Sequence, residues 1–555
     1  MSVNILTPTN IWGNFYTEVP VKAKTAVQKT IDGVMLSYVK IAGREVNGER
    51  VEVMALLSKK ENFKGGPAIL VSSNPELPIS EELAIKFAKE GYLVLSVDLG
   101  GQNEESKLYT VYPKSISYAN FVESKNNLLG VNGSVKNTCW YEWGAVLFYA
   151  YEYLREQCGK SRIGVVGVKH GANAAWCLAA NKQEISACVF LNNAGWLAYK
   201  GVYKYANTLE PDFSDEACAF IAGIDSQAYA NHVKSPTLIL SALLDSEFDP
   251  DRADDTIARI SKDVYSCIDF TLSYESGISQ SAYNNMLVFL NNFLRTTRKT
   301  FIKEPKISAT VKNGEIVINT EFDGKNVKDV VVYFSEEIDN PFERTFESAK
   351  KVCIKEKEAT FTFKPYAYSK SVLIFAKAFY ENGFSISSNL LSKKINAEDF
   401  MPSNKSKIIF STREENSESI FSVSNNLDID FLASYAPVIK KGPMDIMGAY
   451  SSHKLTTKKV LTSKNTPSED AMLILDFYSK EHTILNVTLS VKTEFGITDY
   501  TAYYKSNGGN VWCSVRLGME KFKTAEGRIL KSYENLYSLS FSAEGEYLVN
   551  NILWV

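Results

Sequence analysis

The segment 167–171, Gly-Val-Lys-His-Gly, has the frame of a motif that presents a serine nucleophile, but a lysine stands at the serine position. An apolar run, 163–166, precedes it, and small residues, 172–175, follow. A buried strand, a sharp turn and a helix in that order are what G-x-S-x-G needs to expose its central side chain. The flanking glycines allow the tight turn and close packing of helix on strand. Lys169 cannot perform the acyl transfer of a serine, because an amine nucleophile needs a desolvated or cationic environment.

The length and charge of the chain limit the classes of protein to which it can belong. It has 555 residues, of which 45% are hydrophobic and 23% charged, and its net charge is −3. That length predicts several domains, and so small a charge gives no sign of nucleic acid or an anionic membrane as a partner. The chain starts without a basic and apolar leader and has no apolar stretch of about 20 residues, which predicts a cytoplasmic protein without a membrane span. The eight cysteines lack C-x-x-C spacing, which predicts reduced thiols.

Residues 1–300 alternate apolar strands with helices. This pattern predicts an α/β domain with a mostly parallel sheet and helices on both faces. The strand candidates are 51–57, 68–72, 92–97, 163–168, 187–191, 237–242 and 268–273, and the helix candidates are 81–89, 141–155, 172–180 and 284–294.

Two β-rich parts follow. Residues 301–397 contain short strand candidates and hairpin turns at Asn313-Gly314 and Asn382-Gly383, which is typical of an immunoglobulin-like or fibronectin-like sandwich. The next change falls at residues 399–402 and is followed by the polar residues 403–406. Residues 398–555 are again rich in strand candidates, and their length predicts a larger β-sandwich, jelly-roll-like in connection.

Several segments of residues 1–300 occur in an order known from one enzyme family. Residues 88–94 lead into Asp98-Leu99-Gly100-Gly101, residues 140–143 open the helix before the elbow strand, 163–171 form the elbow, and 238–245 end in an acid. In this order they resemble bacterial α/β-hydrolases of the acetyl xylan esterase and cephalosporin-C deacetylase type. The resemblance implies an α/β-hydrolase domain whose substrates would be acylated saccharides.

The family pattern can be carried over one residue at a time. The nucleophile, acid and histidine positions are Lys169, Asp245 and Ile278, and the oxyanion region holds Ser73, Asn74 and His170. Asp245 has substitutes nearby in Glu247 and Asp249, but no histidine lies near Ile278. A serine triad needs the hydroxyl, its base and the oxyanion donors together. The loss of nucleophile and base therefore predicts a degenerate triad without esterase activity.

Two interpretations of Lys169 remain open. It either forms an ion pair with Asp245, whose charge would be costly if buried alone, or acts as an amine nucleophile. His170 either packs beside the elbow or takes part in catalysis. The histidines lack any metal-ligand spacing, so we expect no metal, and nothing indicates a cofactor.

Aromatic residues are the other candidates for ligand contact. Those in the hydrolase-like part follow the carboxyl ends of strands, where α/β sheets bind ligands, and could stack on the C–H faces of sugars. The alternative is that they form a small core of their own. The candidates are Tyr112, Trp196 and Tyr199 in the first part and Tyr503, Tyr504 and Trp512 in the last.

The favoured function is non-catalytic binding of a carbohydrate or acylated saccharide on a degenerate α/β-hydrolase. An active carbohydrate esterase with relocated catalytic groups and a structural interaction scaffold are the two alternatives. The C-terminal sandwich is a candidate carbohydrate-binding module. The sequence identifies neither the ligand nor the oligomeric state.

Overall fold

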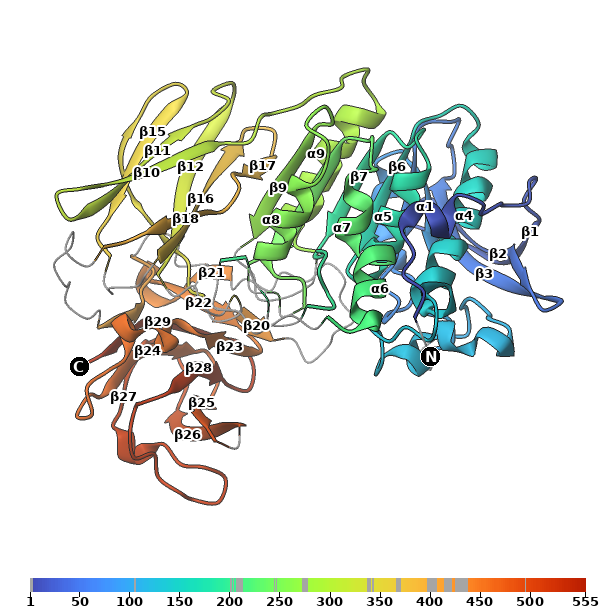
Figure 1. Cartoon of the computed structure of the whole chain (residues 1–555). Coiled ribbons are helices and arrows are strands. Elements are labelled where there is room, and N and C mark those ends of the chain that lie inside the picture. The colour runs from blue at the N-terminus through green and yellow to red at the C-terminus, as the bar shows by residue number, and fades with distance from the viewer. Residues whose placement is uncertain are drawn as a thin grey trace.

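The computed structural model shows an α/β half, a middle β-rich part and a C-terminal β-sandwich (Figure 1). For residues 422–424 and 463, the structure describes the backbone but not the side chains. The structure describes the chain except for residues 1–2, 104–105, 200–201, 203, 206–212, 244, 246, 272–277, 337–340, 342–343, 366–370, 397–406, 414–421, 425–437 and 495.

The α/β half is built on a sheet with the strand order β1-β2-β3-β5-β4-β6-β7-β8-β9. The strands from β4 to β9 run parallel, and β1, β2 and β3 pair antiparallel at one edge. The strands are β1 (Ala23–Ile31), β2 (Val34–Val46), β3 (Glu49–Lys60), β4 (Ala68–Ser72), β5 (Leu93–Val97), β6 (Ile163–Val168), β7 (Ala187–Leu191), β8 (Thr237–Ala242) and β9 (Ser266–Thr271).

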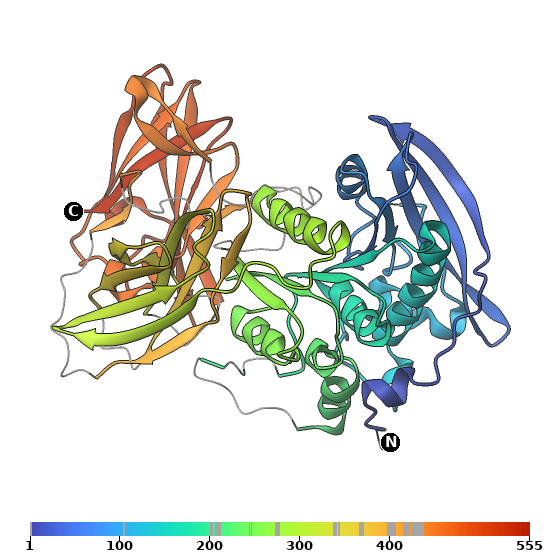
Figure 2. The same ribbon diagram turned by 90° about the horizontal axis from the view of Figure 1, so that it is seen from above.

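Helices cover both faces of this sheet (Figures 1 and 2). Side chains of α4, α5, α7 and α8 belong to one hydrophobic cluster, and those of α2 and α9 to another on the opposite face. The parallel strands β4 to β8 are buried throughout, which explains their continuous apolar runs. The helices are α1 (Pro8–Trp12), α2 (Glu81–Lys89), α3 (Phe121–Ser124), α4 (Cys139–Cys158), α5 (His170–Asn181), α6 (Asp215–Gly223), α7 (Ser226–Ala230), α8 (Pro250–Ala258) and α9 (Gln280–Leu294).

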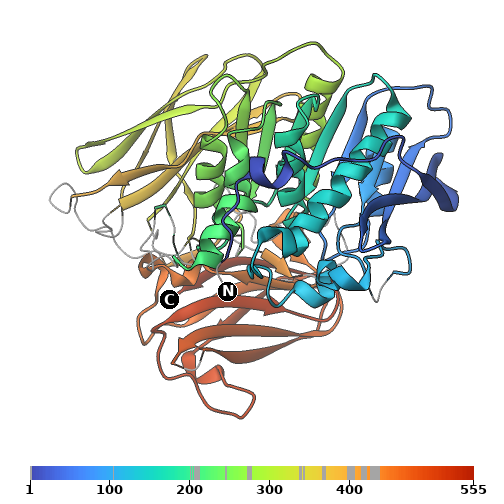
Figure 3. The ribbon, with the colours of Figure 1, turned by 45° about the vertical axis from the view of Figure 1, so that its right-hand side comes forward.

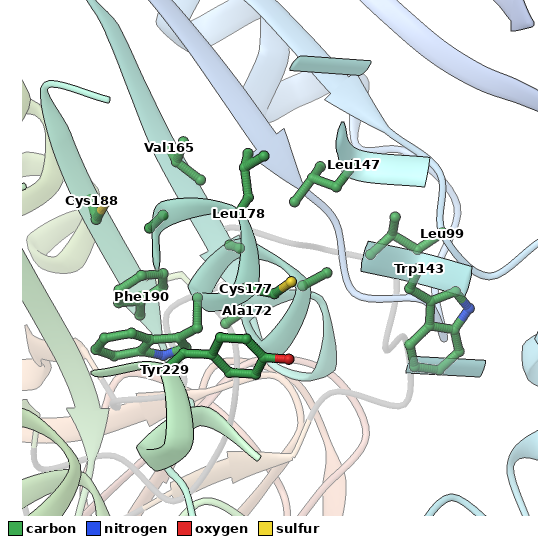
Figure 4. Close-up of a cluster of buried hydrophobic side chains, with 14 of the residues drawn as sticks. Leu99, Trp143, Leu147, Val165, Ala172, Cys177, Leu178, Cys188, Phe190 and Tyr229 are labelled. Carbon is green, nitrogen blue, oxygen red and sulfur yellow. The ribbon is translucent and has the colours of Figure 1, made fainter. Parts of the chain in front are cut away.

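The core around α5 holds the elbow in place. A Cβ added to Gly167 in β6 would lie 2.6 Å from the Cα of Ala172, so the strand and the helix can approach this closely only with glycine there. Figure 4 shows the cluster around α5, with Trp143 and Leu147 of α4 among its members. The sequence prediction of an α/β part with a mostly parallel sheet agrees with these strands and helices.

The middle part is continuous with the α/β half. Its strands β12, β13, β16, β17 and β18 continue the large sheet, because Ser387 of β17 pairs with Ile268 of β9. The second sheet has the order β10-β11-β15-β14 and packs against the first. The strands are β10 (Lys306–Lys312), β11 (Glu315–Glu321), β12 (Val327–Ser335), β13 (Glu347–Ser348), β14 (Lys350–Ile354), β15 (Glu358–Phe363), β16 (Ser371–Tyr380), β17 (Ser385–Ser387) and β18 (Leu391–Lys394).

Buried polar contacts strengthen this junction. The ammonium of Lys377 lies 2.9 Å from Oδ2 of Asp269 in β9, and Asn285 of α9 donates to the same oxygen at 2.8 Å. Arg344 makes a bidentate pair with Asp251 of α8 at 2.5 and 2.9 Å, and both side chains are fully buried. Pairing β17 on β9 also covers an edge that would otherwise stay open. The two parts therefore share one sheet, and the middle part contributes side chains to both hydrophobic clusters.

The C-terminal part is a sandwich of two antiparallel sheets around a common core (Figure 3). One sheet has the order β21-β22-β29-β24-β27 with β19 beside β29, and the other has the order β20-β23-β28-β25-β26. Lys464 pairs with Glu347 of β13 at 2.8 Å and links the sandwich to the middle part. The predicted boundary at residues 397–398 falls within 397–406, which lies outside the described residues. The strands are β19 (Ile408–Phe410), β20 (Ser422–Ser424), β21 (Val438–Lys441), β22 (Met447–Ser451), β23 (Lys454–Thr457), β24 (Leu473–Ser479), β25 (Thr483–Thr493), β26 (Gly496–Ser506), β27 (Cys513–Leu517), β28 (Leu536–Ser542) and β29 (Tyr547–Trp554).

None of the described helices combines the length and apolarity needed to cross a bilayer. In the same residues, no cluster of three or more His, Cys, Asp or Glu side chains has the arrangement of a metal site.

Candidate functional site

Lys169 occupies the strained turn between β6 and α5. Its backbone has φ +48° and ψ −127°, a region that residues other than glycine rarely adopt. A Cβ on Gly171 would lie 2.1 Å from the carbonyl oxygen of Ser73, so the loop after β4 presses directly on the start of α5. The predicted strand, sharp turn and helix are confirmed at these residues. The turn holds its central side chain at the carboxyl edge of the sheet, where an elbow presents a nucleophile.

Asp245 lies in the loop after β8 and is 4% exposed. Its Oδ1 accepts the backbone N–H groups of Glu247 and Phe248 at 2.8 and 2.9 Å. Its Oδ2 is buried and has no hydrogen-bond partner among the described residues. Burial raises the pKa of Asp245, and the two N–H donors and the charge of Lys169 oppose that rise. The predicted contact of Lys169 with Asp245 is thus an attraction through space rather than a hydrogen-bonded ion pair.

His170, the first residue of α5, is 4% exposed. Its Nε2 lies 2.8 Å from Oε1 of Glu247, and its Nδ1 is buried without a partner in the described part of the chain. The rings of Trp140 and Phe248 pack around the imidazole, with centroids 5.6 and 5.3 Å away. The elbow therefore has an imidazole and a carboxylate in contact, but the imidazole follows the nucleophile position instead of facing it from the loop after β9.

The oxyanion region is formed by the residues after β4. Ser73 and Asn74 are both buried, and Oδ1 of Asn74 has no hydrogen-bond partner among the described groups. Both residues line a small cavity that extends toward Ser96 of β5, whose hydroxyl is likewise buried and unpartnered. The backbone N–H of His170 belongs to the first turn of α5, where a helix has no acceptor of its own. Polar groups with unmet hydrogen bonds thus flank the elbow on this side too.

Ile278 does not supply a polar group. It is 1% exposed and belongs to the hydrophobic cluster of α2 and α9. The rest of the predicted histidine loop, 272–277, lies outside the described residues, and none of its residues is a histidine. The imidazole of a serine triad therefore has no source at this position.

Sequence reasoning missed Asn193, which supports the elbow from the end of β7. Its Nδ2 donates to the carbonyl of Lys169 at 3.0 Å and to Oδ1 of Asn173 at 2.6 Å. Its Oδ1 accepts from Nε1 of Trp176 at 3.0 Å and from the hydroxyl of Ser226 at 2.8 Å. The signal in the sequence is a pair of asparagines directly after a buried strand, at the carboxyl edge of the predicted parallel sheet.

An aromatic stack starts three residues after Asn193. The rings of Trp196 and Tyr199 are nearly parallel, with centroids 6.0 Å apart, and Phe213 packs edge-on against Tyr199 at 6.2 Å. Phe213, which sequence reasoning did not single out, is 71% exposed. Trp196 has φ +63°, rare for so large a side chain, and its indole N–H donates to Asp255 at 2.7 Å. The stack is therefore held in a strained position with its outer ring open to solvent.

Tyr112, which the sequence suggested as a ligand contact, is buried instead. It is 8% exposed, and its hydroxyl donates to the carbonyl of Leu99 at 2.7 Å. Its ring also lies against Gly101, whose Cβ would stand 3.0 Å from it. Tyr112 fills the core under the connection after β5, so it offers no face to a ligand.

The three aromatic candidates of the C-terminal sandwich lie on different surfaces. Tyr503 is 71% exposed, whereas the next residue of β26, Tyr504, is half-buried against the core. Trp512 lies on the other sheet, where it covers Gly442 and Gly448 and donates to the carbonyl of Pro443 at 3.2 Å. Trp512 and Tyr504 therefore pack within the domain, and of the three only Tyr503 projects into solvent. The structure does not bring these residues together with the elbow.

The strand order, the parallel strands and the elbow together define an α/β-hydrolase-like fold. No protein-family model and no curated protein sequence matches the chain. Among solved structures, the chain is similar over 49% of its length to 88% of acetyl xylan esterase 1 from Thermoanaerobacterium sp., at 14% identity and a TM-score of 0.36.

An acetyl xylan esterase from Paenibacillus sp. gives 13% identity, 50% and 90% coverage of the two chains and a TM-score of 0.35. A cold-adapted esterase from an Arctic intertidal metagenomic library gives 11% identity, 48% and 97% coverage and a TM-score of 0.33. Likeness at this level says nothing about the activity of this chain, which must be argued from its own elbow.

Proposed function

We propose that this protein binds a saccharide or an acylated saccharide at the elbow and does not hydrolyse it. The proposal rests on the buried polar atoms near the elbow that have no hydrogen-bond partner among the described residues. The elbow itself keeps the strand, sharp turn and helix that present a side chain. Oδ2 of Asp245 and Oδ1 of Asn74 are buried acceptors, and the ammonium of Lys169 lies close enough to Asp245 to act on its charge. Buried polar atoms normally have a partner, and a polyhydroxylated ligand supplies both donors and acceptors.

The absence of turnover follows from the groups present. A serine hydrolase needs a hydroxyl nucleophile and a base within reach of it. Lys169 replaces the first, and the position of the second holds the apolar Ile278 in the core. Groups that stabilise an oxyanion can hold a ligand, but without a nucleophile they cannot start the reaction.

The aromatic stack is the reason for choosing a saccharide as the proposed ligand. Phe213 is open to solvent and rests on Tyr199, which in turn stacks on Trp196. Aromatic faces bind the apolar C–H surface of a sugar ring, while polar groups bind its hydroxyls. Gly195 and Asn193 connect this stack to the elbow within a few residues of chain, so both can contact one ligand.

The test combines binding with turnover on the full chain. Isothermal titration with xylo-oligosaccharides, acetylated and plain, should show binding that weakens about tenfold in Lys169→Ala or Phe213→Ala. Lys160→Ala and Tyr16→Ala are the matched controls, since Lys160 is exposed before the same strand and Tyr16 is 72% exposed. Binding of none of the saccharides, or equal loss in the controls, would overturn the proposal.

His170 and Glu247 favour one rival, a hydrolase with relocated groups. A carboxylate at Nε2 could orient the imidazole so that Nδ1 serves as a general base toward water. Release of acetate from acetylated xylo-oligosaccharides that disappears in His170→Asn would establish this rival. If the protein neither binds these saccharides nor releases acetate from them, the remaining function is that of an interaction scaffold. The sheet shared by the first two parts would give such a scaffold a rigid frame.

A further inference from the structure

The outer face of the five-stranded C-terminal sheet is unusually regular. Its side chains form three adjacent rows across neighbouring strands, and every member carries a hydroxyl, an amide or a carboxylate. The central row is Thr456, Ser540, Thr488 and Thr501. The second row, on one side of it, is Ser542, Asn486 and Tyr503, and the third row, on the other side, is Ser538, Ser490 and Asp499.

Hydrogen bonds between strands fix these side chains in position. The hydroxyls of Thr488 and Thr501 lie 2.9 Å apart, and Ser490 donates to Asp499 at 2.7 Å. In the second row, Nδ2 of Asn486 donates to the hydroxyl of Ser542 at 3.4 Å. The side chains of Thr488, Thr501, Asn486 and Ser542 are partly exposed and keep lone pairs or protons for a ligand. Ser490, Ser538 and Ser540 are only 5, 6 and 2% exposed and support the face from within.

The composition of this face is not explained by strand formation. Serine, asparagine and aspartate are not favoured in strands, yet they occupy most of the second and third rows. Tyr503 is 71% exposed in the second row, directly opposite Asn486. An exposed aromatic ring inside a polar surface can stack on the C–H face of a sugar while its neighbours bind the hydroxyls.

We propose that this face, centred on Tyr503 and Asn486, binds a neutral polysaccharide chain. A protein partner would need an apolar centre, whereas the exposed apolar side chains of these strands, Ile484 and Ile497, lie at opposite ends of the face. Nucleic acid would need a concentration of positive charge, whereas Asp499, in the third row, is the charged member of these three rows and the chain has a net charge of −3. β25 and β26 are 11 residues long and lie at the end of the sandwich away from the α/β half, so a long chain could cross them (Figure 1).

This inference extends the saccharide chemistry of the proposed function to a second surface that does not share residues with the elbow. Affinity electrophoresis of the full chain in gels containing xylan, mixed-linkage β-glucan, galactomannan or dextran tests it. At least one of these glycans should retard the wild type. Tyr503→Ala and Asn486→Ala should weaken that retardation about tenfold.

Met444→Ala is the control within the same domain, because Met444 is 87% exposed in the hairpin between β21 and β22 of the opposite sheet. Retardation by none of the four glycans, or retardation unchanged in both row variants, would overturn the inference. Retardation that is lost in Lys169→Ala but kept in Tyr503→Ala would support the elbow site and refute this one. Retardation lost in Tyr503→Ala and Asn486→Ala but kept in Lys169→Ala would support the sheet-face site and count against the elbow site.

Discussion

Arg344 and Asp251 offer the sharpest test of how the first two parts are joined. Arg344→Ala removes a fully buried cation that binds Asp251 of α8 through two hydrogen bonds. The remaining carboxylate would stay buried without its partner, beside Asp249, whose pKa burial already raises to about 7. Breaking one side of a buried pair costs about 3–5 kcal/mol, so we expect the free energy of unfolding to fall by that amount.

The assay is urea unfolding of the full chain, followed by tryptophan fluorescence. Arg298→Ala, an exposed arginine after α9, is the control and should change the free energy of unfolding by no more than about 0.5 kcal/mol. The double variant Arg344→Met with Asp251→Leu removes both charges and should recover most of the loss, because paired removal is often close to neutral. A loss below about 1 kcal/mol in Arg344→Ala, or no recovery in the double variant, would refute this account of the junction.

Four further outcomes follow. Gly171→Ala should destabilise the protein strongly in a thermal shift assay, because its Cβ would stand 2.1 Å from a backbone oxygen, whereas Gly66→Ala, with its closest contact at 3.4 Å, should not; equal shifts would contradict the packing argument. Lys169→Gly should be more stable than Lys169→Ala by about 1 kcal/mol, since only glycine relieves a backbone at φ +48°, and the reverse order in urea unfolding would be inconsistent with strain at the elbow. Burial raises the pKa of Asp225 from 3.8 to about 7, so the folded state holds this proton more tightly than the unfolded chain and loses stability as pH rises from about 4 to 7; Asp225→Asn should flatten that slope, and an unchanged slope would contradict it. A fragment of residues 1–300 should be far less soluble than the full chain, because it exposes β9 and leaves Asp251 and Asp269 without Arg344 and Lys377; a soluble fragment of equal Tm would show that the two parts fold independently.

The local parts of the fold could be predicted from the sequence because their causes are local. The elbow strand, expected at 163–168, is Ile163–Val168, and Lys169 is the turn residue, since an apolar run, two glycines and a small-residue helix start are all adjacent. The buried strands β7 and β8 also fall at the expected residues, because a parallel strand covered on both faces is an uninterrupted apolar run.

The junction and much of the site could not be predicted, because they depend on residues far apart in sequence. Asp269 and Lys377 are 108 positions apart, and neither has a neighbour that signals the pair. The strand that joins the sheets, β17, has only three residues. Alternation along β26 places Tyr503 and Tyr504 on opposite faces, but only the packed sandwich decides which face meets solvent. The contact of His170 with Glu247 likewise arises from loops that meet only in the fold.

The central claim is that the elbow binds without cleaving. Its most direct test is the rate at which the purified chain releases acetate from acetylated xylo-oligosaccharides, compared with the rates of Lys169→Ala and His170→Asn. The account predicts that all three release nothing above the rate without protein, while the wild type still binds the oligosaccharide in the same samples. Release by the wild type that falls to background in either variant would contradict it.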